Sequence, residues 1–355
     1  MIPNIDFKII TEERRHHCSQ CGAELASIRI TCTHCFQEVV KQAASTWTNL
    51  EFKAEGGFAK VYKATWRQGR WECKPESNNS SVRYYRRGGP MEVALKEEKT
   101  PTRLSTEFLK EASAYLKCEY RFLSDNQLFG FSVNPETDQI ILVMRYMSGG
   151  DLRRLLMEKP DLGWSDRLEQ LASVMRDLQN IHKAGFVHKD FHCGNILWTR
   201  DEFQNYELCI SDFGLSAASD IYAFGMVMWE FSSGKQPFHE YDPDFALLRS
   251  IISGLRPTPV EGTPDCYVDL MTRCWAAKPE DRPTSEEVHN ELLTLMEMND
   301  KVLPTFNDMI FEQFETADSL RSEIDNSEYV ATYQRDRYIS RSFNATRGFT
   351  VELDL

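Results

Sequence analysis

The sequence lacks any long hydrophobic run. Its first twenty residues contain no apolar stretch of signal-peptide length, and the longest apolar-dominated run, Ile221–Phe231, is too short to span a bilayer. An excess of positive charge is also absent, because 54 acidic side chains outweigh 41 basic ones and give a net charge of −13. We therefore expect a cytoplasmic protein, with the nucleus as the alternative, that has no membrane partner and no general affinity for nucleic acid.

Glycine and proline are too few for a collagen-like or low-complexity chain. There are 18 Gly and 14 Pro among 355 residues, and hydrophobic residues make up 41%. This composition also excludes a wholly disordered chain. At about 150 residues per domain, the length predicts roughly two domains. No sequence feature points to a particular oligomeric state.

Four of the ten cysteines stand together near the N-terminus, in a CxxC, ten-residue, CxxC arrangement: Cys18, Cys21, Cys32 and Cys35. Two CxxC turns can direct four thiolates at one tetrahedral ion, so residues 1–46 are predicted to form a zinc-ribbon-like element and linker with structural Zn²⁺. Four cysteines would close the coordination sphere, which argues against a catalytic metal there. A redox cysteine pair is the alternative. Three neighbouring histidines offer other ligands: His16, His17 and His34.

The rest of the chain changes character near its middle. Short β-like runs fill the front half, in the ranges 47–66 (a hairpin), 92–97, 127–132 and 139–146. The polar, basic stretch 67–90 is predicted to be a loop, and a helix is expected to begin at Ser105. Residues 150–298 are predicted to be mainly helical, and residues 299–355 to form a disordered tail. The pattern predicts an α+β, two-lobed chain with a hinge at Arg145–Gly150.

One lysine and one glutamate occupy positions that draw them toward the interior. Lys96 ends the apolar strand VALK, and Glu111 lies on the apolar face of the helix that is expected from Ser105. Charged groups in such positions need partners, so an ion pair between Lys96 and Glu111 is predicted. A purely structural pair is the alternative.

Two acids and an amide follow in apolar surroundings. The segment FVHKDFHCGNIL contains Asp190 and Asn195, and ELCISDFGL places Asp212 directly after an apolar strand. Carboxylate and amide oxygens are ligands that Mg²⁺ accepts beside phosphate oxygens and water. Each residue alone could instead be a cap or a turn residue. The ordered set favours a site.

These residues together resemble a known family. Ala94-Leu95-Lys96, Glu111, His188-Lys189-Asp190 with Asn195, and Asp212-Phe213-Gly214 are similar, in order, to the protein kinase signatures VAIK, the αC glutamate, HRDxxxxN and DFG. The segments SDIYAFGMVMWE and RCWAAKPEDRPT resemble the tyrosine-kinase-like branch. The resemblance covers residues 49–298 and implies the two-lobed protein kinase fold, with lobes 47–147 and 148–298.

The resemblance implies transfer of the γ-phosphoryl group of Mg·ATP to a hydroxyl of a protein substrate, Ser/Thr rather than Tyr, as in most of that branch. Asp190, Lys96 and Glu111 would be catalytic, and Asn195 and Asp212 would hold Mg²⁺. Met144 would be the gatekeeper residue. The implied nucleotide-binding positions are Gly56, Gly57, Val61, Ala94, Lys96, Met144, Arg145, Met147, Asp151, Asn195 and Asp212.

The nucleotide loop and the catalytic segment depart from the family pattern. Ala54 and Ala59 stand where the family has glycine, which restricts positive φ and close backbone approach to a phosphate. His192 stands two residues after Asp190, where neither a serine/threonine-type lysine nor the tyrosine-kinase pattern is present.

The segment after Gly214 is shortened. Only residues 215–219 precede Asp220, so the activation segment and the APE motif are absent, and Arg282 is expected to lack the glutamate with which it pairs in the family. Three alternatives follow: a kinase represented by a shortened chain, a pseudokinase that acts as a nucleotide-binding signalling scaffold with protein partners, and an active kinase with an open groove.

Overall fold

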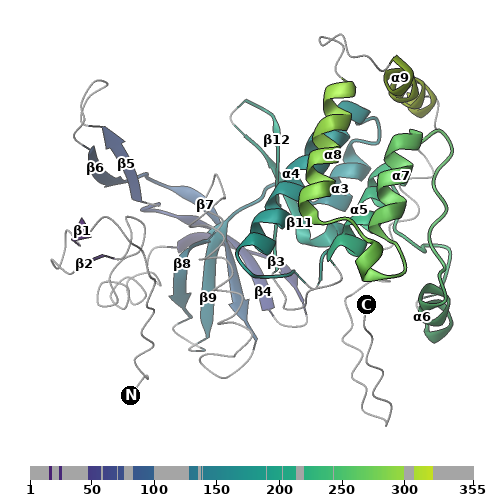
Figure 1. Cartoon of the computed structure of the whole chain (residues 1–355). Helices are drawn as coiled ribbons and strands as arrows, with labels where there is room; N and C mark the ends of the chain where they lie inside the picture. Colours follow the sequence, from purple (N-terminus) through teal and green to yellow (C-terminus); the bar gives the residue numbers. More distant parts are fainter. Residues whose placement is uncertain are drawn as a thin grey trace. The chain divides into compact units, whose positions relative to one another are not determined.

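The computed structural model divides into two units. The described residues are 16–17, 24–25, 47–56, 59–69, 71–75, 83–99, 128–134, 137, 139–188, 190–201, 203–212, 220–242, 244–299 and 308–322. The division falls between Tyr146 and Met147, inside the predicted hinge range. Strands make up the described part of the first unit up to Tyr146, whereas helices dominate the second (Figure 1). The predicted β-rich front part and helical rear part are confirmed.

Two very short strands are described near the N-terminus. β1 (His16–His17) pairs in antiparallel fashion with β2 (Glu24–Leu25). The four cysteines of the predicted zinc element lie outside the described residues, so that element stays a prediction.

The first unit is built on a five-stranded antiparallel sheet in the order β3-β4-β7-β9-β8. Its strands are β3 (Trp47–Glu55), β4 (Ala59–Trp66), β7 (Met91–Glu98), β8 (Leu128–Val133) and β9 (Ile140–Arg145). Side chains alternate along β7: Val93 and Leu95 are buried with Ala64 and Val143 in a small core. Ala94 and Lys96 therefore belong to the opposite face. The predicted hairpin and the strands at 92–97, 127–132 and 139–146 are confirmed.

The prediction of a loop over residues 67–90 is wrong in part. β5 (Trp71–Pro75) and β6 (Arg83–Arg87) form an antiparallel pair within that stretch. Turn-type residues led to the loop interpretation, but they concentrate in the connection, while the flanks carry Trp and Tyr, which favour strands. Arg87 ties the end of β6 down by donating to the Gly69 carbonyl at 3.0 Å and lying 5.5 Å over the Trp66 ring.

The second unit combines helices with a small three-stranded sheet (Figure 1). The helices are α3 (Leu152–Glu158), α4 (Trp164–Lys183), α5 (Asp220–Ser233), α6 (Phe245–Ile252), α7 (Asp265–Cys274), α8 (Ser285–Met298) and α9 (Asp308–Ser322), with short 3-10 turns η1 (Cys193–Asn195) and η2 (Pro279–Asp281). The sheet has the order β10 (Gly150–Asp151), β11 (Ile196–Arg200), β12 (Tyr206–Ile210). No helix in the described parts of the chain has the length and apolarity to cross a bilayer.

Helix α4 is the centre of the helical core. It packs against α8 and β12 and contributes fully buried residues such as Leu168, Leu171 and Met175. It also carries a buried arginine, Arg167, whose guanidinium is satisfied by main-chain oxygens. Arg167 donates to Leu162 O at 2.6 Å and also to the carbonyl of Phe231 in α5. A buried guanidinium bonded in this way fixes α4 to α5 without a carboxylate.

Part of the predicted disordered tail is helical: α9 lies within the range 299–355. Phe314 is fully buried and its ring lies 5.8 Å from that of Trp164, at the start of α4. Asp318 accepts the Trp164 N–H at 3.0 Å, and Gln313 accepts the Asp265 N–H, at the start of α7, at 2.9 Å. The helix therefore supplies acceptors that two helix N-termini need. The remainder of the predicted tail, beyond Asn299, lies outside the described residues.

Candidate active site

The loop that precedes β11 and carries Asp190 and Asn195 is anchored by a buried histidine. The His188 N–H donates to Asp220 Oδ2 at 2.7 Å, and His188 Nε2 lies 2.7 Å from the Ser211 carbonyl. A carbonyl only accepts, so the ring nitrogen Nε2 carries a hydrogen. Burial lowers the pKa of His188, which favours this neutral form. The imidazole therefore joins the loop to the end of β12.

Asp220 anchors this arrangement from the first turn of α5. Its carboxylate is 1% exposed and accepts from the His188 backbone and from His182 Nε2, the latter at 2.9 Å. His182 in turn reaches Ser285 at the start of α8, with 3.2 Å between Nδ1 and Oγ. One carboxylate thus ties α4, α5 and the loop together. The sequence reasoning treated Asp220 only as a helix start and missed this function.

Asp190 and Asn195 are brought together at the exposed end of the loop. Asn195 Nδ2 donates to the Asp190 carbonyl at 2.8 Å and lies 3.5 Å from Asp190 Oδ2. Because the amide nitrogen is used in this way, Asn195 Oδ1 is the atom left to act as a ligand. The Asp190 carboxylate is 52% exposed. A substrate and solvent can therefore reach it.

Asp212 belongs to the same network through its neighbour. Ser211 N and Oγ both donate to the Asn195 carbonyl, at 2.8 and 3.0 Å. Asp212 follows with φ of +62°, a left-handed conformation that costs about 1 kcal/mol or more in a residue other than glycine. The predicted residues Asp190, Asn195 and Asp212 thus lie in one hydrogen-bonded constellation of the second unit. Both Asp190 and Asp212 are exposed.

A second ion pair, between α3 and α5, supports the same loop. Arg153 of α3 donates to Glu230 of α5 at 2.9 Å, and Glu230 is 2% exposed. Burial raises the pKa of the neighbouring Cys193 thiol, with a further contribution from Glu230, so this cysteine is a neutral packing residue. The pair was not predictable from a local pattern, because its members are separated by 77 positions.

In the first unit, the predicted nucleotide residues share one face of the sheet. In the strand register, Lys96 lies directly opposite Val61 on β4 and Leu142 on β9. Ala94 lies opposite Lys63 and Met144. Directly paired residues of antiparallel strands present side chains on the same face. Lys96 therefore lies among apolar side chains and is half-buried. Such a face can cover a flat apolar ring and offer the Lys96 ammonium group beside it.

The loop between β3 and β4 begins with a tight turn. Gly56 N donates to the Ala59 carbonyl at 2.9 Å, and Lys99 Nζ donates to the Gly56 carbonyl at 2.5 Å while pairing with Glu55 at 2.7 Å. Two of the predicted nucleotide and catalytic residues, Gly57 and Glu111, lie outside the described chain, as do Phe213 and Gly214, which follow Asp212 in the motif. The predicted pairing of Lys96 with Glu111 thus stays a prediction.

The remaining predicted positions lie near the division between the units. Arg145 ends β9 in the first unit, and Met147 begins the second unit, 7% exposed, with its carbonyl accepting from Gly150 N at 3.3 Å. Asp151 is the N-cap of α3, where its Oδ1 accepts the Arg154 N–H at 2.9 Å. Asp151 therefore has a structural function, and its contact with a ribose stays a prediction.

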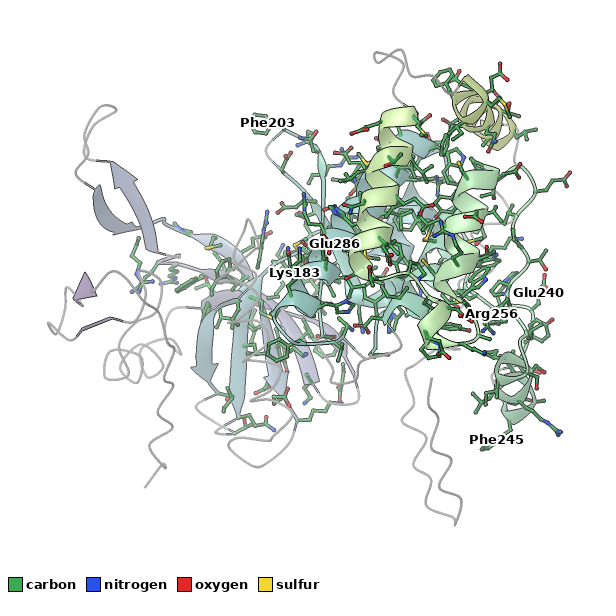
Figure 2. The ribbon with its side chains drawn as sticks, in the orientation of Figure 1. Lys183, Phe203, Glu240, Phe245, Arg256 and Glu286 are labelled. Carbon is green, nitrogen blue, oxygen red and sulfur yellow. The ribbon has the colours of Figure 1, made fainter. Side chains whose placement is uncertain are left out.

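The expectation for Arg282 needs correction. The guanidinium donates to the carbonyls of Ala276 and Ala277, at 2.9 and 3.3 Å, and lies 5.1 Å over the Tyr222 ring. Arg256 lies over the same ring at 4.9 Å, and Figure 2 shows it in the helical unit. Burial lowers the pKa of Arg282. Main-chain oxygens and an aromatic face therefore satisfy a group that was expected to be left without a partner.

Side chains that could ligate a metal ion do not form a cluster in the described chain. It contains no group of three or more His, Cys, Asp or Glu side chains that could hold an ion. The two residues predicted for Mg²⁺ are one amide, Asn195, and one carboxylate, Asp212. Two oxygen ligands suffice for Mg²⁺ when substrate phosphates and water fill its other positions, so these residues fit that ion.

Comparison with protein families decides the class. Residues 50–219 and 215–292 match the family model described as "Protein tyrosine and serine/threonine kinase". The chain belongs to this protein kinase family. Members of this family use ATP and Mg²⁺ to phosphorylate proteins. The match comes in two parts, which overlap at residues 215–219.

Individual relatives of the kinase include both specificity classes. It is 27% identical over 236 residues to "Dual specificity protein kinase pyk3" of Dictyostelium discoideum (57% of this chain, 17% of the relative). It is 32% identical over 214 residues to "Probable serine/threonine-protein kinase roco8" of the same organism (49% and 11%). With human "Cytoplasmic tyrosine-protein kinase BMX" the identity is 29% over 246 residues (59% and 35%). The kinase thus spans at most about a third of the length of these relatives.

Proposed function

We propose that this kinase transfers the γ-phosphoryl group of Mg·ATP to a hydroxyl group of a protein, with serine or threonine favoured over tyrosine. The observation that carries the proposal is the constellation of Asp190, Asn195 and Asp212, held by buried bonds from His188 and Ser211. Phosphoryl transfer needs positioning and charge neutralisation more than covalent participation by the protein. A rigid loop that presents an exposed carboxylate suits that need.

Asp190 is proposed to receive the proton of the attacking hydroxyl. The hydroxyl oxygen forms a bond to the γ-phosphorus, the bond from that phosphorus to the bridging oxygen of ADP breaks, and the proton passes to a carboxylate oxygen of Asp190. Asn195 Oδ1 and the Asp212 carboxylate would hold Mg²⁺, which supplies neutralising charge to the phosphates when bound.

The first unit is proposed to bind the nucleotide. Lys96, held by Glu111, would neutralise the α- and β-phosphates, and the apolar side chains of Val61, Ala94 and Met144 would cover the base. The shared sheet face of Lys96, Val61, Ala94 and Met144 supports this assignment. Backbone groups of Arg145 and Met147 would pair with adenine, Asp151 would contact the ribose, and the turn at Gly56-Gly57 would cover the phosphates.

The test is phosphate transfer by the full chain to serine, threonine and tyrosine peptide libraries, with ATP labelled at the γ-phosphate. Asp190→Asn, Lys96→Met and Asp212→Asn should each lower the rate at least about a hundredfold, because each removes a charge from the reacting groups. Asp242→Asn, at an exposed aspartate outside the loop, serves as the matched control and should keep the wild-type rate. Equal rates for all four variants would refute the assignment.

A non-catalytic scaffold is the second candidate. Only seven residues separate Asp212 from Asp220, and the two-part family match meets at this point. A connection of this length spans at most about 25 Å and leaves little chain to form a platform for a peptide. Saturable binding of ATP without transfer to any library peptide, together with a nucleotide-dependent change in hydrogen exchange, would favour the scaffold.

A further inference from the structure

The His192 ring is folded back over its own loop. Its Nδ1 accepts the Gly194 N–H at 2.9 Å and so caps η1. A Cβ atom added at Gly194 would lie 2.8 Å from His192 Cε1, 2.9 Å from Nδ1 and 3.0 Å from Arg153 Nη1. Contacts shorter than 3.0 Å do not occur for real Cβ atoms. The glycine is therefore required for the ring to occupy this position.

The capping bond determines which nitrogen carries the proton. A nitrogen that accepts a hydrogen bond has no hydrogen, so the neutral ring has its hydrogen on Nε2. Nε2 lies 3.7 Å from Asp190 Oδ1, and Asn195 Nδ2 lies 3.5 Å from Asp190 Oδ2. Each oxygen of the carboxylate thus has one N–H group of the loop beside it.

We propose that His192 is a positioning residue for Asp190, an inference that rests on the proposed phosphoryl transfer. Its Nε2–H keeps Oδ1 on one side of the loop while the amide of Asn195 keeps Oδ2 on the other. Both separations exceed a normal hydrogen bond, so the N–H groups orient the carboxylate by electrostatic attraction and leave its lone pairs available to a substrate hydroxyl. The orienting group is an imidazole whose tautomer is fixed by a backbone N–H.

The support beneath the ring makes this orientation persistent. Arg153 lies against the Gly194 side of the loop, and its bond to the buried Glu230 holds it there. The His192 ring and Arg153 thus both border the position of Gly194. A histidine without such support would exchange between rotamers and could not orient a neighbouring group.

A matched pair of substitutions distinguishes the function of Nε2 from that of Nδ1. In His192→Gln the amide nitrogen reaches the place of Nε2, whereas in His192→Asn the side-chain amide reaches only the place of Nδ1. If His192 orients Asp190, His192→Asn should lower kcat about tenfold with little change in KM for ATP, and His192→Gln should keep kcat within about threefold. Equal kcat values for the two variants would overturn the proposal. His239→Gln and His239→Asn, outside the loop, should both match the wild type.

The second arm does not depend on activity. In the full chain, 15N nuclear magnetic resonance of His192 should show Nδ1 as an acceptor and Nε2 as protonated, and Gly194→Ala should abolish this pattern. A proton on Nδ1 in the wild type would overturn the proposal even if phosphate is transferred. If the wild type transfers no phosphate while the tautomer is as expected, the proposed function fails, and with it the effect of His192 on catalysis, although the loop geometry stands.

Discussion

Replacing Asp220 by alanine should destabilise the helical unit by about 2 to 4 kcal/mol. The larger part comes from His188, whose fully buried N–H would lose a charged acceptor, a loss of about 1.5 to 3 kcal/mol. His182 is 23% exposed, so water can replace its bond, and this part should stay below about 1 kcal/mol. Asp220→Asn keeps one acceptor oxygen and should fall between alanine and the wild type.

Urea unfolding of the full chain, followed by helical circular dichroism, measures these differences. His182→Asn tests the smaller part alone, and Asp161→Ala, at an exposed aspartate, should be neutral within about 0.5 kcal/mol. If Asp220→Ala unfolds at the same urea concentration as Asp161→Ala, the buried carboxylate does not hold the loop and the reasoning is refuted.

Three further predictions concern other parts of the chain. Phe314→Ala should destabilise the helical unit by about 3 kcal/mol or more in urea unfolding, because a fully buried ring is removed. Met309 is 72% exposed on the same helix, so Met309→Ala should change the free energy of unfolding little. Equal effects of the two substitutions would mean that α9 is not docked. Burial raises the pKa of Asp177 to about 7 from its ordinary 3.8, so the folded state binds a proton that the unfolded state has released, and stability should fall as pH rises from about 4 to 7. The free energy of unfolding, measured with urea at pH 5 and at pH 8, should fall by at most about 3 kcal/mol in the wild type. Asp177→Asn should remove this fall, while Glu169→Gln, exposed on the same helix, should keep it. The four cysteines Cys18, Cys21, Cys32 and Cys35 should bind one Zn²⁺ per chain by elemental analysis, and Cys18→Ser with Cys21→Ser should abolish it.

Local patterns predicted the strands of the five-stranded sheet. The alternation along β7, with Val93 and Leu95 buried, is visible in the sequence because it repeats every second residue. β5 and β6 escaped prediction because their pairing joins residues on either side of a turn-rich connection. Short polar strands are recognised by their partners more than by their own composition.

The sequence predicted the site residues that stand in contiguous motifs. It did not predict the groups that support them from distant parts of the chain. Asp190, Asn195 and Asp212 stand within two short segments of the sequence. The groups that hold them are Asp220, Glu230 and His182, which meet the loop only in the folded chain. The partners of Arg282 were missed for the same reason. They are carbonyl oxygens and an aromatic ring, which the sequence does not identify as partners of a guanidinium, whereas a carboxylate in a known motif can be recognised.

Helix α9 has a consequence for how fragments of this chain should be made. The family match stops at residue 292, and a fragment cut there or at Met298 would omit α9. Trp164 would lose the ring of Phe314, and the first N–H groups of α4 and α7 would lose Asp318 and Gln313. Uncovered aromatic surface promotes self-association. A fragment that extends to Ser322 should therefore be monodisperse in light scattering under conditions in which the shorter one aggregates, so the border of family similarity is a poor border for expression.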